Sequence, residues 1–426
     1  MRTLIISLWN RTRESYWFLP SVMLVGGIVA AIVFLQIDAA YSESFDNWFW
    51  LYRASPDAAR ALLGAVISSM VTISGVSFSI IVVALTLASS QFGSRLLRNF
   101  TSDLVSQMVL GIFLATFAYS LLILQSIKEQ VPPFSVTVAL VLAIAAVLGF
   151  IYFIHHIAES IQSENIVAEV GQELQQTIRT EYRCGEHQFA AQEYAPGVVS
   201  IPSEFEGYLT AIDTAGLIEL AQRQRAKIHL AVRPGDYCIP GARLLTMHGS
   251  DIPSPKEFTG FFVLNSRPTP EQDVAFAIQQ LVQVAVRALS PGINDPFTAV
   301  TCIDRLAAGL ALVARSEPRV QVLTDAEGVE RLYLRSPEFS ELVAMSIAPI
   351  RRCAATAVPV YERLLHLLSE LLWHAAPDRH PLLRAHAQDV LSSALDHLTL
   401  SSDLECVQTA HQHFARRLAE LTERAA

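Results

Sequence analysis

The pattern of apolar and charged positions divides the chain into two parts. Within the first 160 residues, four stretches contain no Asp, Glu, Lys or Arg: 17–37, 61–94, 104–127 and 130–158. A transmembrane helix needs about 20 apolar residues, so each stretch is long enough to cross a bilayer. No apolar run of that length follows in the rest of the chain. The pattern therefore predicts a four-helix transmembrane domain over residues 1–158 and a water-facing remainder.

The water-facing part is expected to contain three regions. The helical pattern of the fourth stretch continues to about residue 182, which predicts a helical stalk or linker over residues 159–195. Pro and Gly then punctuate short runs of β-forming residues, such as GYLTAI and KIHLAV, and predict a small β domain over 196–265. Amphipathic stretches predict a cytosolic helical bundle over 266–426. The expected fold class is an α-helical integral membrane domain followed by a cytosolic α+β domain.

Composition and charge agree with this division. Hydrophobic residues make up 52% of the chain and charged residues 17%, as expected for an average over an apolar and a soluble part. Up to residue 160, eight basic and eight acidic residues balance, so the formal net charge of −9 arises from the second part. A net-acidic water-facing part argues against nucleic acid as a partner, because phosphate binding needs a basic surface. The five Cys are far apart without a CxxC spacing, so we expect no metal site and no cofactor.

Basic residues near the apolar stretches predict how the chain crosses the membrane. Lys and Arg are retained on the cytoplasmic side of short loops. Arg2, Arg11 and Arg13 precede the first stretch, and Arg95 and Arg98 lie between the second and third. Both termini are therefore expected in the cytoplasm. The pair at 95 and 98 would contact anionic lipid headgroups, the more common role of such residues, or form the cytosolic mouth of a pore.

The second apolar stretch carries small and hydroxylated residues at helical spacing. They share one face of a helix: Ser68, Thr72, Gly75, Ser79, Thr86 and Ser90. Such a stripe predicts either a packing seam, where small residues let helices approach closely, or a water-filled pore in an oligomer, where hydroxyls replace part of an ion's hydration. The two interpretations are compatible with each other. In a pore, Phe78, Val82 or Val83 could form an apolar constriction.

The residues absent from the apolar stretches restrict the transport mechanism. Proton-coupled transporters and pumps place Asp, Glu, Lys or His within the membrane. The stretches contain only His155 and His156, which lie at the interface end of the fourth. A passive pathway or a scaffold is consistent with this pattern, and an ion-coupled carrier is not. Gly26 and Gly27, each followed four residues later by Ala, are expected to make small-xxx-small helix contacts.

The segment ALSPGINDPFTA joins two predicted helices of the bundle. Pro291 and Gly292 end the first helix, and Asn294 or Asp295 caps the second, whose first position is a Pro. Turn chemistry alone accounts for the motif. Its functional interpretation is a turn that contacts a ligand or another subunit, where free amides at a helix N-terminus would attract an anion. The residues of this turn are Ser290, Pro291, Gly292, Asn294 and Asp295.

Three blocks of the sequence are shared with a known family. They are SGVSFSIIVVALTLASSQFGSRLLRNF at 74–100, GYLTAID at 207–213 and RALSPGINDPFTAVTCID at 287–304. In this order the chain resembles, over nearly its whole length, the bacterial predicted membrane protein family called domain of unknown function 2254. The resemblance implies four spans followed by a cytosolic domain, in the bacterial inner (plasma) membrane. It implies no catalytic residues.

Known catalytic motifs are absent from the sequence. No GxSxG, HExxH, P-loop or dinucleotide-binding motif is present, so we expect the protein not to be an enzyme. The sequence predicts a homo-oligomeric channel for ions or small solutes, in contact with membrane lipid, with a cytosolic regulatory domain. The alternative is a membrane-anchored ligand sensor or scaffold without transport activity.

Overall fold

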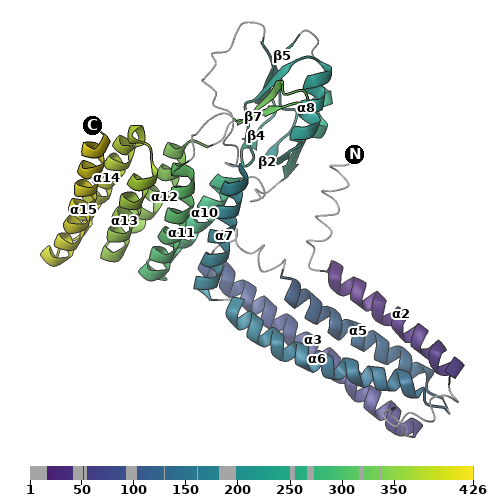
Figure 1. Cartoon of the computed structure of the whole chain (residues 1–426). Helices are drawn as coiled ribbons and strands as arrows, with labels where there is room; N and C mark the ends of the chain where they lie inside the picture. Colours follow the sequence, from purple (N-terminus) through teal and green to yellow (C-terminus); the bar gives the residue numbers. More distant parts are fainter. Residues whose placement is uncertain are drawn as a thin grey trace. The chain divides into compact units, whose positions relative to one another are not determined.

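The structure, a computed structural model, consists of two compact units, Arg2–Gln162 and Ser163–Ala426. Figure 1 follows the sequence through both units by colour. In the described residues, the first unit contains only helices, whereas the second contains helices and strands. The described residues are 17–41, 51, 55–92, 103–128, 130–160, 162–181, 198–249, 255–265, 273–315, 321–334 and 337–425.

Four long helices form the described part of the first unit (Figure 1): α2 (Phe18–Tyr41), α3 (Pro56–Phe92), α5 (Leu104–Ser126) and α6 (Pro133–Ser160). Helix α5 is central, because it packs against α2, α3 and α6. In the apolar segment of each helix, the share of residues that is buried is 56% in α5, 11% in α2 and 22% in both α3 and α6. The three outer helices therefore expose apolar side chains along most of their length, as expected for helices in a membrane.

Close contact between α2 and α5 depends on glycine. A Cβ atom on Gly27 would lie 2.6 Å from the carbonyl oxygen of Ala115, and one on Gly111 would overlap the sulfur of Met23. Small residues at such positions let helix backbones approach each other. Gly26, in contrast, has no atom within 4 Å of the position of a Cβ. Both glycines were expected to make helix contacts, but of the two only Gly27 does.

Charged side chains cap the ends of helices in this unit. Asp38 in α2 is buried and accepts hydrogen bonds from the backbone N–H groups of Phe134 and Ser135, at 3.0 and 2.8 Å. It therefore caps the first turn of α6. Asp103 caps the start of α5 in the same way and lies 3.0 Å from Nε2 of His156 in α6. These carboxylates satisfy backbone groups that have no partner within their own helix.

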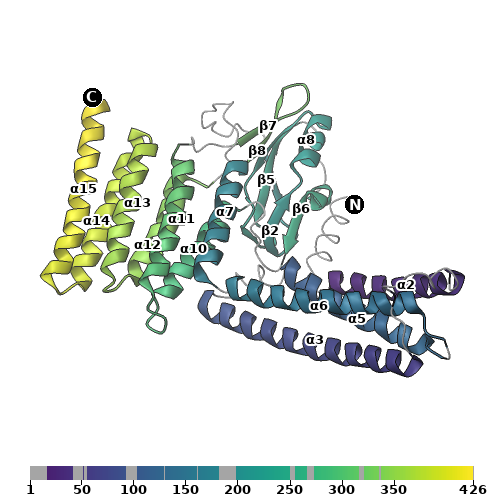
Figure 2. The same cartoon turned by 60° about the horizontal axis from the view of Figure 1, so that its bottom comes forward.

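The helices of the second unit form a row (Figures 1 and 2): α7 (Ser163–Glu181), α10 (Val274–Ala288), α11 (Pro296–Ala314), α12 (Phe339–Cys353), α13 (Val358–His374), α14 (His380–His397) and α15 (Ser401–Ala425). Helix α11 is interior and packs against α7, α10, α12 and α13. A Cβ on Gly171 of α7 would lie 2.8 Å from the side chain of Arg305, and one on Gly309 of α11 would lie 2.7 Å from Leu174. These glycines allow α7 and α11 to pack closely.

The expected continuous helix leaving the fourth apolar stretch is absent. Helix α6 ends at Ser160 and α7 begins at Ser163, so the predicted stalk is a separate element. Its apolar positions, including Ile166, Val170 and Leu174, are buried in contact with the bundle. Their periodicity indicated a helix correctly, but it did not show that tertiary packing would make this helix a member of the bundle.

Two sheets lie between α7 and α10 in the sequence and are completed by a later hairpin (Figure 1). The five-stranded sheet has the order β1-β5-β3-β8-β7, and the three-stranded sheet has the order β4-β2-β6. Short helices α8 (Thr214–Arg223) and α9 (Pro255–Phe258) accompany them. Leu217 of α8 packs into one core with Ile228 and Leu245 of the larger sheet. The strands are β1 (Val198–Pro202), β2 (Gly207–Ile212), β3 (Lys227–Leu230), β4 (Tyr237–Cys238), β5 (Arg243–His248), β6 (Phe262–Asn265), β7 (Gln321–Thr324) and β8 (Glu330–Leu334).

The last two strands correct the prediction of a purely helical region after residue 266. The hairpin of β7 and β8 lies between α11 and α12 in the sequence. Strand β8 pairs with β3 in parallel, with Ile228 opposite Leu332. Leu332 is buried in the sheet core, so a contact with a distant strand decides its structure. Local sequence patterns do not reveal such pairing.

The apolar helices number five in the described residues, against the expected four. The additional one is α11, which is also long and apolar enough to cross a membrane. Because α11 packs among four other helices of the bundle, burial within protein accounts for its composition. The overall class is as predicted: a mostly helical chain with several apolar helices and a region that contains sheets.

Candidate functional site

The small and hydroxylated residues of α3 lie on one exposed face of the helix. The stripe consists of Ser68, Thr72, Gly75, Ser79, Thr86 and Ser90, all of which are exposed. The hydroxyls of Thr72 and Ser79 donate to the backbone carbonyls of Ser68 and Gly75, both at 2.9 Å, and Thr86 and Ser90 bond within the helix in a similar way. A Cβ atom added to Gly75 would meet nothing within 4 Å. The stripe is therefore an open face.

The opposite face of α3 packs against the other helices of the unit. Its buried members include Leu63, Met70, Ser77, Ile81 and Ala84. Met70 and Ile81 share a core with Phe113 of α5. Because this buried face lies opposite the stripe, the stripe is not a packing seam among the described helices of one chain. A seam with a second copy and the lining of a pore are both compatible with this geometry.

The other polar residues predicted near the membrane are two arginines and two histidines. Arg95 and Arg98 lie outside the described residues, so their roles at a pore mouth or in lipid contact stay predictions. His155 lies 3.4 Å from Glu159, and His156 pairs with an aspartate. In the described part of the chain, no group of three or more His, Cys, Asp or Glu side chains is arranged to hold a metal ion.

The turn between α10 and α11 is built by its own hydrogen bonds. The hydroxyl of Ser290 donates to the carbonyl of Arg287 at 2.6 Å, and the N–H of Asn294 donates to the carbonyl of Ser290 at 2.9 Å. Asn294 has a φ of 51°, a left-handed conformation that Asn tolerates better than most residues. Asp295 caps α11 by accepting from the N–H of Thr298 at 3.1 Å. The predicted cap is present, and internal contacts use its polar groups.

The same turn exposes apolar side chains that the sequence reasoning did not single out. Pro291 and Gly292 are exposed, as are Ile293 and Asn294. Phe297, in the first turn of α11, is 73% exposed, the highest value among the exposed large hydrophobic residues of the described chain. In the sequence Phe297 follows the Pro of a helix cap, and this local pattern gives no signal of whether its side chain is buried. The turn therefore offers an apolar surface in addition to polar groups.

A polar cluster, also missed from the sequence, lies on one face of the five-stranded sheet. The ring of His229 stacks on that of Tyr333 at 4.1 Å between centroids, and His248 lies 5.1 Å from His229. Lys227 donates to the Tyr333 hydroxyl at 3.0 Å, and that hydroxyl donates to Glu330 at 2.7 Å. Three strands contribute: β3, β5 and β8. Because β8 is far from β3 and β5 in the sequence, no local motif signals the cluster.

Burial and charge set the protonation of this cluster. Burial, together with the neighbouring His248 and Lys227, lowers the pKa of His229 to about 4. The hydrogen bond with Tyr333 raises the pKa of Lys227. At neutral pH the cluster therefore combines an uncharged imidazole with a charged ammonium group. This arrangement can bind a polar ligand at the sheet surface.

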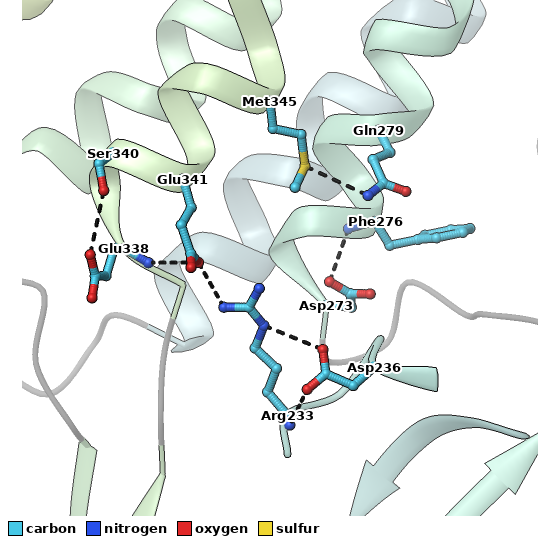
Figure 3. Close-up of polar contacts among 9 residues, drawn as sticks. All are labelled: Arg233, Asp236, Asp273, Phe276, Gln279, Glu338, Ser340, Glu341 and Met345. Carbon is cyan, nitrogen blue, oxygen red and sulfur yellow. Dashed lines mark hydrogen bonds and ion pairs between the residues drawn. The ribbon is translucent and has the colours of Figure 1, made fainter. Parts of the chain in front are cut away.

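A second group of charges joins the β region to the helices, as Figure 3 shows. Arg233 precedes β4, and its guanidinium donates to Glu341 of α12 at 2.9 Å. Its Nε lies 3.7 Å from Asp236, and its backbone N–H donates to the same carboxylate at 3.0 Å. One arginine therefore holds the turn before β4 against the start of α12.

The start of α10 meets the same turn. Asp273 caps α10 by accepting from the N–H of Phe276 at 2.9 Å. A Cβ on Gly235, whose φ is 96°, would overlap the Asp273 carboxylate, so only glycine fits this turn. Burial raises the pKa of Asp273 to about 6. The N-terminal ends of α10 and α12 are thus both held by one turn of the β region.

Comparisons with known proteins place this architecture in a family. An uncharacterized protein of Mycobacterium bovis (strain ATCC BAA-935 / AF2122/97) is 30% identical over 428 residues, which cover 96% of this chain and 81% of the relative. An uncharacterized protein of Mycobacterium tuberculosis (strain ATCC 25618 / H37Rv) has the same identity and coverage. No solved structure matches the chain. The family model described as "Predicted membrane protein (DUF2254)" matches residues 13–370, and the chain therefore belongs to this family of predicted membrane proteins.

Proposed function

We propose that this protein crosses the bacterial inner membrane four times, with α2, α3, α5 and α6 as the spans. Each of these helices is long and apolar enough to span a bilayer. An even number of spans puts both termini on one side, and the basic residues before the first span favour the cytoplasm. The second unit is then cytoplasmic. Helix α11 stays outside the membrane in this topology, because neighbouring helices bury its apolar side chains.

The proposed function is a passive pathway for ions or small solutes in a homo-oligomer whose α3 stripes face one another. The position of the stripe, opposite the buried face of α3, carries this proposal. Helix α3 also exposes apolar side chains beside the stripe, such as Val71 and Val83, but α2 and α6 expose Val, Ile and Leu without a comparable row of hydroxyls. Those faces suit lipid, whereas a row of hydroxyls suits water or another polar helix.

Hydrogen bonding within α3 indicates which permeant the stripe would favour. The hydroxyl protons of Thr72, Ser79 and Thr86 are donated to carbonyls of the same helix. Each oxygen keeps lone pairs that accept hydrogen bonds or coordinate a cation. The stripe has no Asp or Glu that would bind a cation tightly. Weakly bound cations and water are therefore the expected permeants.

Flux through the purified protein in liposomes tests this function. Wild type, Thr72→Trp and Val147→Trp are compared with fluorescent reporters for potassium, chloride and protons. Both replaced residues are exposed, but Val147 lies on the apolar outer face of α6. We expect potassium flux in wild type, its loss in Thr72→Trp, and its retention in Val147→Trp. Equal flux in all three proteins would contradict a pathway along the stripe.

The alternative function, a membrane-anchored ligand sensor or scaffold, is favoured by a different observation. In the cluster a partly buried His229 stacks on a buried Tyr333, and Arg233 connects the same β region to α12. A ligand bound at the cluster would thus be linked to the helices through one ion pair. Absence of flux from correctly inserted wild-type protein under several ion gradients would favour this alternative.

A further inference from the structure

One end of the helical bundle combines exposed apolar side chains with arginines. The apolar residues are Ile293 in the α10–α11 turn and Phe297 in the first turn of α11, which are 39% and 73% exposed. Arg287 is in the last turn of α10. Exposed aromatic residues beside basic ones are typical of surfaces that contact the interface of a membrane.

The start of α7 lies at this same end. Gly171 of α7 meets Arg305 of α11, and Gly309 of α11 meets Leu174 further along α7, so the two helices run parallel. Ser163 lies eight residues before Gly171 in α7, and Phe297 lies eight residues before Arg305 in α11. The first residue of α7 and the exposed phenylalanine are therefore at the same level along parallel helices. Figure 2 shows the start of α7 and the α10–α11 turn at one end of the bundle.

The end of α12 adds further positive charge at this level. Gln279 of α10 donates to the sulfur of Met345 of α12 at 3.7 Å, and both helices begin at the turn that contains Arg233. Helices α10 and α12 are therefore parallel and end together. Arg351 and Arg352 lie in the last turn of α12. Three arginines thus accompany the apolar residues at this end.

Chain connectivity joins the start of α7 directly to the end of α6. Only residues 161 and 162 separate Ser160, the last residue of α6, from Ser163. Three peptide steps span at most about 11 Å, since consecutive Cα atoms are about 3.8 Å apart. In the proposed topology, α6 leaves the bilayer at Ser160, so the start of α7 is held at the cytoplasmic membrane surface.

We propose that the α10–α11 turn and the last turn of α12 form a membrane-docking surface that binds anionic phospholipid. This surface consists of Arg287, Ile293, Phe297, Arg351 and Arg352. The inference rests on the proposed spans but does not depend on the channel function. Phe297 and Ile293 enter the headgroup region, where amphipathic surfaces bury apolar side chains, and the arginines contact lipid phosphates. The Ser290 hydroxyl and the Asp295 carboxylate bond within the turn and the start of α11, whereas the side chains of Ile293 and Phe297 are exposed to a partner.

Photo-crosslinking of the full-length protein in liposomes identifies the occupant of this surface. Phe297 is replaced by p-benzoylphenylalanine, a near match in shape, and Ile239 is replaced in a matched control. Ile239 is 55% exposed and directly follows β4, in the β region that meets the N-terminal ends of α10 and α12, opposite to the C-terminal ends that carry the proposed surface. Vesicles contain phosphatidylcholine with or without phosphatidylglycerol. Adducts are identified by mass spectrometry and gel electrophoresis.

Lipid adducts are expected at position 297 and not at 239, with a higher yield in vesicles that contain phosphatidylglycerol. Arg351→Gln and Arg352→Gln should each lower that yield by up to roughly fivefold, because each basic residue near an anionic membrane contributes about that factor. A crosslinked dimer in place of lipid adducts would assign the surface to a second copy and overturn the proposal. Equal lipid labelling at both positions would overturn it as well. The flux assay tests the channel, and photo-crosslinking tests the docking surface. Failure of one proposal can therefore be distinguished from failure of the other.

Discussion

Carboxylates cap helices in both units, but among the described residues only the second unit also has charged side chains that bond to side chains more than 100 positions away in the sequence. Asp38 and Asp103 cap α6 and α5. Hydroxyls in the middle of α3, such as that of Thr72, bond to their own helix. Arg233 and Lys227, in contrast, bond to residues more than 100 positions away. Helix capping and close helix contact are therefore common to both units, and polar pairs between residues more than 100 positions apart distinguish the second unit.

The largest effect in this comparison is expected from removing a buried cap. Asp38→Ala leaves two backbone N–H groups of α6 without their partner in a buried environment. The free energy of unfolding should fall by about 4 kcal/mol, since buried unsatisfied donors and lost charge-assisted hydrogen bonds are both costly. Denaturation in mixed detergent micelles measures the change. Asp57→Ala, at a side chain that is 94% exposed, is the control and should change little.

A slightly smaller effect is expected from the glycine pair of α2. Gly27→Val would push a side chain against the backbone of Ala115 and should lower the free energy of unfolding by about 3 kcal/mol. Gly26→Val adds the same side chain where nothing lies within 4 Å. Its effect should be within about 0.5 kcal/mol, as for other open positions. Equal losses in the same denaturation assay would show that helix contact does not distinguish the two positions.

Two groups of the second unit should give it opposite responses to pH. The pKa of Asp273 is raised from 3.8 to about 6, so its contribution to stability is lost as pH rises through that interval. The pKa of His229 is lowered from 6.5 to about 4, so its contribution is lost as pH falls through nearly the same interval. In wild type the two slopes oppose each other.

Single substitutions should reveal each slope. Asp273→Asn should leave a protein that loses stability as pH falls below about 6.5, and His229→Gln should leave one that loses stability as pH rises toward 6. Each change should amount to about 1 to 2 kcal/mol after allowance for solvent screening. Thermal unfolding of the full chain in detergent, followed by circular dichroism at several pH values, measures both. Parallel pH profiles for the two variants would contradict the assignment.

The smallest effect is expected for single hydroxyls of the stripe. Ser79 is exposed, and its hydroxyl bonds to the carbonyl of Gly75 in the same helix. Ser79→Ala should therefore change the free energy of unfolding of one chain by less than about 0.5 kcal/mol. The micelle denaturation assay used for Asp38→Ala measures it. A loss as large as that for Gly27→Val would mean that the stripe packs within the chain.

Periodicity in the sequence indicated the helical regions of both units, because apolar positions repeat with the helical period in each, but it did not reveal the breaks between α6 and α7 or between α12 and α13. It also placed Ser68 to Ser90 on one face of α3. It did not reveal whether that face is buried, since burial depends on which neighbours pack against the helix. Gly26 and Gly27 illustrate the same limit: adjacent and chemically identical, they differ only in what lies opposite.

The polar sites of the second unit were less accessible to sequence reasoning. The cluster of Lys227, His229 and Tyr333 requires β8 to pair with β3, and the intervening sequence holds two long helices of the bundle. The contact of Arg233 with Glu341 also joins residues that are 108 positions apart in the sequence. The SPGINDP turn was predicted because a helix cap is local, whereas the exposure of Phe297 depends on the whole bundle.

Disulfide crosslinking between copies tests the central claim, that the α3 stripe faces the α3 of another copy. The five native Cys are replaced by Ala, and a single Cys is introduced as Thr72→Cys or, in the control, Val147→Cys. Membranes are treated with a mild oxidant, and the products are separated by gel electrophoresis without reductant. The account predicts a covalent dimer for Thr72→Cys and monomer for Val147→Cys. A dimer formed equally at both positions, or only at the α6 position, would contradict it.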